Sequence, residues 1–176
     1  MLNNEQINEF QTERFITTGC FDTGSKEGFL KSSPLGSCVA IVAYDSSTKI
    51  GGLAHAMLPG KSVKENDNKY AEDIITNMID DLTCLGAMKT TIEICLVGGA
   101  NVLRRKNDNI GDNLILSIYE ILKKKKLPVN AKSLSGFERR SVSLDLCSGL
   151  VNYTIGESNK KTLYQFSAIE MKGDYK

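Results

Sequence analysis

The chain has 176 residues, a hydrophobic fraction of 41% and 22 basic against 21 acidic side chains, a composition typical of a soluble globular protein. A formal net charge of +1 argues against a general attraction to nucleic acid, and no apolar run approaches the roughly 18–20 residues that span a bilayer. The polar N-terminus lacks the layout of a signal peptide, so we expect a cytoplasmic protein with no nucleic-acid partner and no membrane insertion.

The beginning of the chain carries little hydrophobic patterning. Residues 1–14 are polar and are expected to form an N-terminal extension to a single domain over residues 15–176. Residues 15–30 mix β-forming side chains with three glycines, which predicts short extended pieces and turns.

A β-hairpin is predicted next. Residues 39–44 read Val-Ala-Ile-Val-Ala-Tyr, the pattern of a buried strand, and residues 45–48 are polar turn formers. Residues 49–57 are expected to return as the second strand. Within them, the glycines at positions 51–52 indicate a bulge or a close approach of another chain segment.

The middle of the chain alternates helical and extended patterns. An amphipathic helix is predicted over residues 70–85, with Gly86 as its stop signal. A strand is predicted over residues 90–97, and the glycine pair that follows is expected to end it. A turn over residues 109–113 can cap a second helix over residues 113–126.

The last third of the chain is predicted to be β-structure. Two β-patterned segments, residues 140–147 and 151–155, flank Ser148-Gly149, which reads as a hairpin turn. Residues 163–169 form a possible final strand. The whole pattern predicts a mixed α+β fold.

Five cysteines, an odd number with no Cys-x-x-Cys pair, argue against a disulfide framework or a zinc site. We expect no metal and no cofactor. The ordinary role of such a cysteine is that of a small buried side chain, which we expect for Cys84 in a helix and for Cys95 and Cys147 in strands.

His55 is the only histidine of the chain, and the predicted hairpin brings it near Cys38. An imidazole beside a thiol can carry its proton and activate the sulfur as a nucleophile. With the turn at residues 45–48, Cys38 should lie roughly opposite residues 52–55. Backbone N–H groups near Gly36 and Ser37 are candidates for binding an oxyanion. Spacing alone, however, favours the alternative of a buried cysteine and a structural histidine.

A longer set of motifs resembles the CheD family, the chemoreceptor glutamine deamidases of bacterial and archaeal chemotaxis. The resemblance covers about residues 15–155 and rests on order and spacing. Its central part is Leu35-Gly36-Ser37-Cys38-Val39-Ala40, followed by Gly51-Gly52-Leu53-Ala54-His55-Ala56-Met57-Leu58-Pro59. It continues through Lys69-Tyr70-Ala71, Leu85-Gly86-Ala87, Val97-Gly98-Gly99-Ala100, Asn109-Ile110-Gly111 and Arg140-Ser141-Val142.

The resemblance implies a fold, an activity and a mechanism. The fold would be α+β, with mixed or antiparallel sheets in a β-sandwich-like core flanked by helices. The activity would be that of a cysteine-dependent amidohydrolase, which converts receptor glutamines to glutamate and releases ammonia. By the same resemblance Cys38 is the nucleophile, His55 its base, and Ser32 stands where the family has a threonine that completes the triad.

The resemblance also suggests partners. The substrates would be the cytoplasmic domains of chemoreceptors, and Gly98, Gly99 and Arg140 are candidates for a substrate or partner surface. Their ordinary roles are a strand-ending turn for the glycines and a solvated strand position for the arginine. A CheC-type phosphatase is a further expected partner, and an adaptor with weak or no turnover is the alternative function. A deamidase or transglutaminase-like enzyme with another target would share the same catalytic parts.

This chain departs from the family's pattern at several points. Besides Ser32, a proline at position 34 replaces the glycine of the family, which stiffens the approach to Cys38. Asp112 and Asn113 stand where an arginine is expected after the Asn-Ile-Gly motif. These changes bear on substrate and partner recognition more than on the pair formed by Cys38 and His55.

Overall fold

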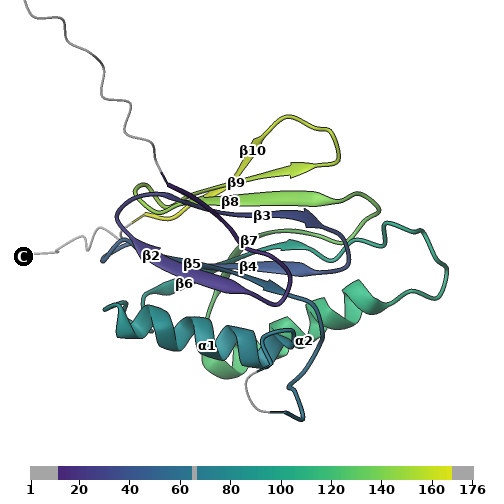
Figure 1. The fold of residues 1–176 in the computed structure, drawn as a ribbon, viewed down its shortest axis with the longest axis horizontal. Coiled ribbons are helices and arrows are strands. Elements are labelled where there is room, and N and C mark those ends of the chain that lie inside the picture. The colour runs from purple at the N-terminus through teal and green to yellow at the C-terminus, as the bar shows by residue number, and fades with distance from the viewer. Residues whose placement is uncertain (1–11, 65–66, 168–176) are drawn as a thin grey trace, which may run out of the picture.

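The computed structural model describes residues 12–64 and 67–167, and in these ranges the chain forms ten strands and two helices in three layers (Figure 1). Two five-stranded sheets face each other, and both helices cover the far side of one of them. The outer sheet has the order β1 (Glu13–Phe15), β3 (Phe29–Leu35), β8 (Arg140–Asp145), β9 (Leu150–Ile155), β10 (Lys161–Gln165). The central sheet has the order β2 (Phe21–Ser25), β5 (Ile50–Ala56), β4 (Val39–Asp45), β6 (Ile92–Gly98), β7 (Val129–Leu134).

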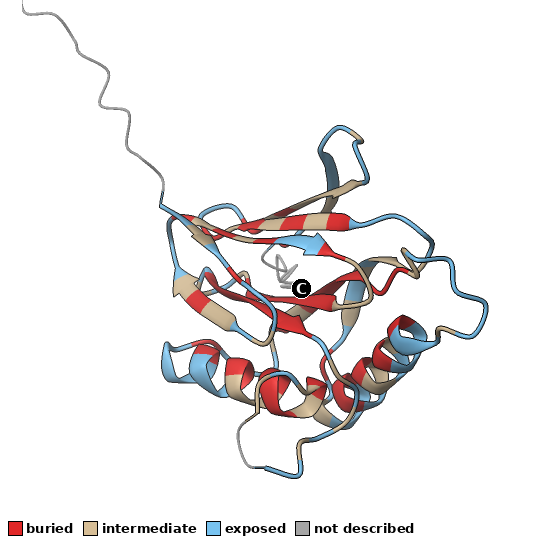
Figure 2. Ribbon diagram, turned by 45° about the vertical axis from the view of Figure 1, so that its right-hand side comes forward, coloured by how far each residue is buried: buried red, intermediate tan, exposed pale blue. Residues whose placement is uncertain are grey.

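This arrangement is the α+β fold with mixed sheets that the sequence predicts. Parallel pairs join β1 to β3 and β6 to β7, and the other pairs are antiparallel. The helices that flank the core both pack on the central sheet and leave the outer face of the outer sheet uncovered (Figure 2). Neither helix in the described ranges is long and apolar enough to cross a membrane.

Burial of the central strands follows from their place between two layers. Every residue of β4 and β5 is buried. Ile41 and Ala43 face the helices, whereas Ala40 and Val42 face the outer sheet, so successive side chains enter two different cores. A strand covered on both faces reads as a continuous apolar run, which is why residues 39–44 are predicted correctly.

The hairpin of β4 and β5 is regular. The register runs without interruption from Val39 opposite Ala56 to Asp45 opposite Ile50. The hairpin therefore has no bulge at the glycine pair, and the close neighbours of these glycines are side chains and not another backbone segment. A Cβ on Gly51 would lie 2.6 Å from Cδ2 of Tyr44, directly across the hairpin.

The helices agree with the sequence prediction to within a few residues. The first, α1 (Ala71–Cys84), is followed by Gly86, whose φ of 110° suits a glycine just beyond a helix end. The second, α2 (Ile110–Lys125), begins three residues earlier than predicted, because the carbonyl of Asn109 already accepts the N–H of Asn113 at 2.8 Å.

The sequence analysis did not predict the strands β3 and β7. In β3 the register against β8 shifts between Ser32 and Leu35, and Pro34 lies within this irregular stretch. Proline lacks an N–H and is tolerated at such irregularities, but its presence argues against a strand in the sequence. β7 alternates polar and apolar side chains too weakly to be recognised, since its residues are intermediate or exposed.

The first and last strands differ from the expected boundaries. β1 crosses the expected domain boundary between residues 14 and 15, and residues 1–11 of the expected extension lie outside the described ranges. The predicted last strand corresponds to β10, which begins two residues earlier and ends at Gln165. Residues 168–169 of that prediction also lie outside the described ranges.

The cysteine predictions are confirmed for one residue and wrong for two. Cys95 is buried in β6, as expected. Cys84 is exposed, because as the last residue of α1 it lies off the buried stripe of that helix. Cys147 is exposed in the turn between β8 and β9, where its N–H bonds to Oδ1 of Asp145.

Candidate active site

Three elements bring the predicted catalytic residues to one end of the layer between the sheets. Ser32 belongs to β3 of the outer sheet, His55 to β5 of the central sheet, and Cys38 to the turn that connects β3 with β4. His55 lies directly opposite Ala40, whose side chain faces the outer sheet, so the imidazole faces the same way. Cys38 directly precedes the first residue of β4, so it lies at the end of the hairpin where His55 is placed.

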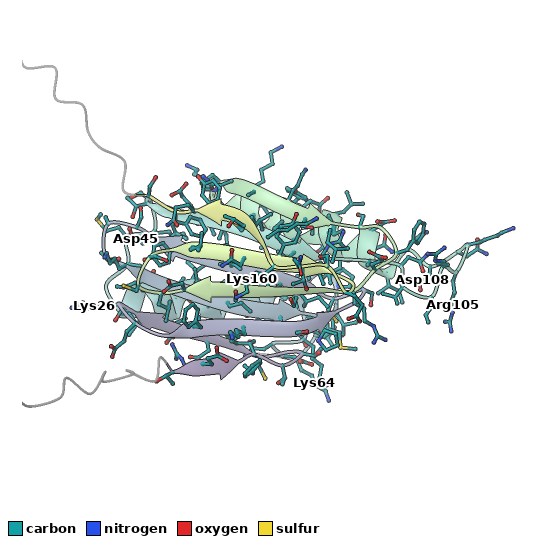
Figure 3. All side chains as sticks on the ribbon, turned by 90° about the horizontal axis from the view of Figure 1, so that it is seen from above. Lys26, Asp45, Lys64, Arg105, Asp108 and Lys160 are labelled. Carbon is teal, nitrogen blue, oxygen red and sulfur yellow. The ribbon has the colours of Figure 1, made fainter. Side chains whose placement is uncertain are left out.

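This end of the molecule also carries an extended loop. β4 starts just after Cys38 and ends at Asp45, so the site lies at the opposite end from Asp45. In Figure 3, Asp45 is at one end of the sheets, and Arg105 and Asp108 project from the other. The loop with these two residues is anchored beside the site, because Ala100 donates its N–H to the carbonyl of Gly36 at 2.8 Å.

The hydroxyl of Ser32 fixes the imidazole. Oγ of Ser32 lies 2.9 Å from Nδ1 of His55 and 2.8 Å from the carbonyl oxygen of Ile16. A carbonyl only accepts, so the single hydroxyl proton goes to Ile16, and the oxygen of Ser32 accepts a hydrogen bond from Nδ1–H. The neutral ring therefore carries its proton on Nδ1, and Nε2 holds the free electron pair. That is the tautomer a general base needs.

Both partners of this hydrogen bond are withdrawn from solvent. Ser32 is fully buried and His55 is 3% exposed. The serine thus takes the place that the resemblance gives to a threonine, and Pro34 does not draw it away from the imidazole. A buried pair of this kind has a fixed geometry, because neither group can exchange its partner for water.

Nε2 of His55 has a neighbour that the sequence analysis missed. Oγ1 of Thr18, an exposed side chain in the turn between β1 and β2, lies 3.4 Å from Nε2. Thr18 is 37 residues from His55 along the chain, and nothing in its sequence context marks it. The contact arises because β2 pairs with β5 and brings this turn over the imidazole.

Cys38 and His55 are diagonal neighbours across the hairpin. The register places Cys38 two residues beyond the partner of His55, slightly further along the hairpin than predicted. The Cα atoms of diagonal neighbours are about 7–8 Å apart, a distance that an aromatic side chain such as an imidazole can span. Within the described ranges, Sγ of Cys38 makes no hydrogen bond to the imidazole. Catalytic hydrogen bonds are often long in an unliganded enzyme and shorten when substrate is bound.

Burial keeps both groups of this pair uncharged. It raises the pKa of the half-buried Cys38 thiol above its ordinary value of 9.0, although a backbone hydrogen bond partly opposes this. It lowers the pKa of His55 below 6.5, and the backbone of Ile16 near the ring, which favours the protonated form, partly opposes that shift. At neutral pH the resting pair is therefore a thiol and a neutral imidazole.

The turn around Cys38 contains backbone N–H groups to which no backbone carbonyl is hydrogen-bonded in the described part of the chain. The carbonyls of Gly36 and Cys38 accept the N–H groups of Ala100 and Gly99, each at 2.8 Å. In the described part of the chain, the N–H groups of Ser37 and Cys38 have no backbone acceptor. Such N–H groups beside a nucleophile are suited to bind an oxyanion, although the N–H of Cys38 also interacts with the thiol of its own residue.

Gly98 and Gly99 are buried, and Gly99 lines a surface pocket together with Asn101 and Phe137, so the expected substrate or partner surface stays a prediction. Gly98 has a φ of 127°, and a Cβ there would lie 2.3 Å from the carbonyl oxygen of Cys38. A Cβ on Gly99 would lie 2.4 Å from Cδ1 of Ile115 in α2. The pair thus forms the strand-ending turn, against which the segment with Cys38 packs closely.

Arg140 is also buried, with 8% of its surface exposed, so the solvated alternative does not hold; it lines a surface pocket with Ser33 and Pro34, and its expected role at a substrate or partner surface stays a prediction. Its Nε donates to Oγ of Ser133 at 3.0 Å, and its two Nη groups donate to the carbonyls of Glu138 and Leu134. Because Arg140 is in β8 and Ser133 is in β7, the guanidinium joins the two sheets. In the described ranges, no group of three or more His, Cys, Asp or Glu side chains could hold a metal ion.

Comparison with known proteins identifies relatives over most of the chain. The family described as "CheD chemotactic sensory transduction" matches residues 57–155. A relative from Chlorobium luteolum, named "Probable chemoreceptor glutamine deamidase CheD", is 35% identical over 78% of this chain and 70% of its own length.

Two further relatives have similar sequence identity to this chain. A "Probable chemoreceptor glutamine deamidase CheD 2" from Methanosarcina acetivorans is 39% identical over 75% of this chain, which spans 62% of that relative. A "Probable chemoreceptor glutamine deamidase CheD" from Methanococcus maripaludis is 38% identical over 72% of this chain and 84% of its own length.

One solved structure is also similar, the hypothetical protein YfiH from Bacillus licheniformis. It is 13% identical over 62% of this chain and 46% of that chain, with a TM-score of 0.41. A likeness at this level supports no conclusion about activity.

Proposed function

Because this chain belongs to the CheD family, we propose that it is a chemoreceptor glutamine deamidase that acts through Cys38 and His55. It hydrolyses the side-chain amide of particular receptor glutamines to a carboxylate and releases ammonia. The names of the relatives support chemoreceptor glutamine as the substrate and deamidation as the reaction. The observation that carries the mechanism is the 2.9 Å contact between Ser32 and Nδ1, which leaves Nε2 of the lone histidine as the proton acceptor.

The first half of the reaction forms a thioester. Nε2 of His55 takes the thiol proton of Cys38 as Sγ attacks the carbon of the glutamine carboxamide. The carbonyl oxygen becomes an oxyanion, which the N–H groups of Ser37 and Cys38 stabilise. When the intermediate collapses, the C–N bond breaks and protonated His55 gives its proton to the leaving nitrogen. Ammonia departs, and the former amide carbon is bound to Sγ.

The second half of the reaction hydrolyses this thioester. Nε2 of His55 is neutral again and takes a proton from water, whose oxygen attacks the thioester carbon. The C–S bond then breaks, glutamate is released, and the thiolate of Cys38 recovers a proton from His55. Ser32 accepts the hydrogen bond from Nδ1–H throughout, so the ring returns to the same tautomer after each step.

The resting state of this enzyme is the neutral pair and not a thiolate–imidazolium ion pair. This assignment rests on the raised pKa of Cys38 and the lowered pKa of His55, both caused by burial. Proton transfer then accompanies the attack on the amide. Reactivity toward other electrophiles is low until a substrate occupies the site, since the thiolate is the reactive form of cysteine.

The remaining expectations about partners stay predictions. They are the cytoplasmic domain of the chemoreceptor as the substrate, association with a CheC-type phosphatase, location in the cytoplasm, and the absence of a cofactor. The steps above use only side chains and backbone of this chain together with water.

The proposed activity is tested by incubating the purified full-length chain with chemoreceptor cytoplasmic fragments. We expect ammonia release, and peptide mass mapping should find an equal amount of glutamine converted to glutamate at a few fixed positions. A folded protein that releases no ammonia and converts no glutamine in any such fragment would contradict the proposal. Conversion of every exposed glutamine in an unfolded control protein would contradict the assigned receptor specificity.

A further inference from the structure

The turn between β1 and β2 is bound directly to the backbone of the candidate base. Gly19 donates its N–H to the carbonyl of His55 at 2.9 Å, and His55 donates its N–H to the carbonyl of Cys20 at 3.0 Å. The turn is closed by a 3.0 Å bond from the N–H of Cys20 to the carbonyl of Thr17. Thr18 therefore has a defined position relative to the imidazole, although its own side chain is exposed.

The direction of the contact between Thr18 and His55 follows from the other side of the ring. Nδ1 carries the ring proton because Ser32 accepts from it, so Nε2 has only an electron pair to offer. A hydroxyl 3.4 Å from that atom can only be the donor. We infer that Thr18 is a positioning residue, whose hydroxyl donates to Nε2 of His55 while Ser32 accepts from Nδ1–H.

This contact has a consequence for catalysis. Thr18 uses the electron pair on Nε2 that must receive the proton of Cys38, so the two side chains compete for one atom. In the resting state the hydroxyl of Thr18 is hydrogen-bonded to this electron pair and keeps the imidazole ring aligned. Because Thr18 is exposed, an arriving substrate can turn its hydroxyl away and free Nε2 for Cys38. The kinetic consequence rests on the proposed function, but the contact itself does not.

Removal of the hydroxyl should make His55 more basic. A donor to Nε2 stabilises only the neutral ring, so its loss favours protonation and raises the pKa of His55. The titratable groups nearest this end of β5 are Cys38 in the turn before β4, Cys20 beside the backbone of His55, and Lys69. The aliphatic chain of Lys69 packs near Gly19. All three are retained in the variants proposed here.

The test uses Thr18→Val and, as its matched control, Thr18→Ser. Valine keeps the branched shape without the hydroxyl, whereas serine keeps the hydroxyl. His55 is the only histidine, so its ring nitrogens and carbon-bound protons are assigned in NMR spectra without ambiguity. We expect Thr18→Val to raise the pKa of His55 by about 0.5–1 unit, the shift expected for one neutral hydrogen bond. Thr18→Ser should match the unsubstituted protein.

A second readout follows from the first. The acid limb of kcat/KM for ammonia release, which reports the free enzyme, should move to higher pH in Thr18→Val by the same shift as the pKa of His55, while Thr18→Ser leaves it in place. An unchanged pKa and unchanged Nε2 resonance in Thr18→Val would overturn the inference, as would a Thr18→Ser protein that behaves like Thr18→Val. The NMR titration needs no substrate, so a protein without ammonia release refutes the proposed function and leaves the inference about Thr18 to its own measurement.

Discussion

Side chains from three separate segments decide the properties of the one imidazole. The family resemblance, and not spacing alone, predicts Cys38, His55 and Ser32 as one site, because it places a cysteine, a histidine and a hydroxyl side chain at these positions. It could not predict Thr18, whose contact with Nε2 depends on the pairing of β2 with β5. Nor could it show which ring nitrogen is protonated, since that depends on the carbonyl of Ile16 as the second partner of Ser32.

The state of protonation predicts the pH dependence of the activity. His55 must be neutral to accept a proton, and burial lowers its pKa below 6.5. The value of kcat/KM should therefore rise with pH along a limb whose midpoint lies below 6.5, and it should not fall again before the Cys38 thiol ionises above pH 9.0. Rates of ammonia release across this range check the prediction. A midpoint above 6.5 would contradict the lowered pKa of His55, whereas a decline between neutral pH and 9.0 would argue for a resting ion pair.

Replacement of Ser32 tests the hydrogen bond to Nδ1. We expect Ser32→Ala to lower kcat by about tenfold to a hundredfold, because the ring loses the partner that fixes its tautomer. The same change leaves buried polar groups of Ile16 and His55 with one partner fewer, so unfolding in urea should show a loss of about 1–3 kcal/mol.

Ser32→Thr is the matched control for this change, because it keeps the hydroxyl and restores the residue of the family pattern. It should retain most of the activity. If Ser32→Ala is as active as the unsubstituted protein, Ser32 has no part in orienting the base.

At the scale of the elements, local pattern predicts the hairpin and both helices but not every strand. β4 and β5 are recognisable because both faces are buried, and the apolar stripes of α1 and α2 have helical spacing. β3 carries two serines and a proline, and its pairing with β8 joins segments more than 100 residues apart. No local signal encodes such a pairing, although it places Ser32 beside His55.

The glycine turn after β6 should be indispensable to the turn that holds Cys38. An added Cβ at Gly98 would meet the carbonyl oxygen of Cys38 at 2.3 Å and Cα of Val39 at 3.1 Å, and backbone atoms cannot move aside cheaply. We expect Gly98→Ala to destabilise the fold by about 3 kcal/mol or more in urea unfolding and to abolish ammonia release.

Gly60→Ala provides the control for the change at Gly98. Gly60 also has a positive φ, 73°, but a Cβ there would have no heavy atom within 4 Å. Gly60→Ala should therefore lower the free energy of unfolding by only about 1–2 kcal/mol, because of backbone strain, and the variant should retain its activity. Equal costs for the two substitutions would show that the close approach to Cys38 is unimportant.

For the whole molecule, the packing of the two sheets is what assembles the site. Ser32 comes from the outer sheet, whereas His55 comes from the central sheet, so their hydrogen bond spans the layer between them. The sequence predicts an α+β fold, but it does not state how the sheets face each other, because that depends on long-range packing of side chains such as Leu30. The resemblance implies a β-sandwich-like core flanked by helices, and the structure adds that both helices form one layer on the central sheet (Figure 1).

Two equal truncations in different layers test this dependence. Leu30 lies between the sheets on β3, and Leu114 lies between α2 and the central sheet; both are fully buried. Leu30→Ala and Leu114→Ala should each lower the free energy of unfolding by about 2–5 kcal/mol. Only Leu30→Ala should change the NMR signals of the His55 ring and lower kcat, because it loosens the layer that holds Ser32. Equal effects on His55 would contradict this account.

The central claim is that Cys38 is the nucleophile of a glutamine deamidase, and replacing it gives the most direct test. Initial rates of ammonia release from a chemoreceptor cytoplasmic fragment are measured for the unsubstituted protein, for Cys38→Ala, and for Cys147→Ala, which changes an exposed cysteine in a distant turn. The account predicts that Cys147→Ala keeps the full rate and that Cys38→Ala, although folded, releases no ammonia above background. Ammonia release that persists in Cys38→Ala would contradict it.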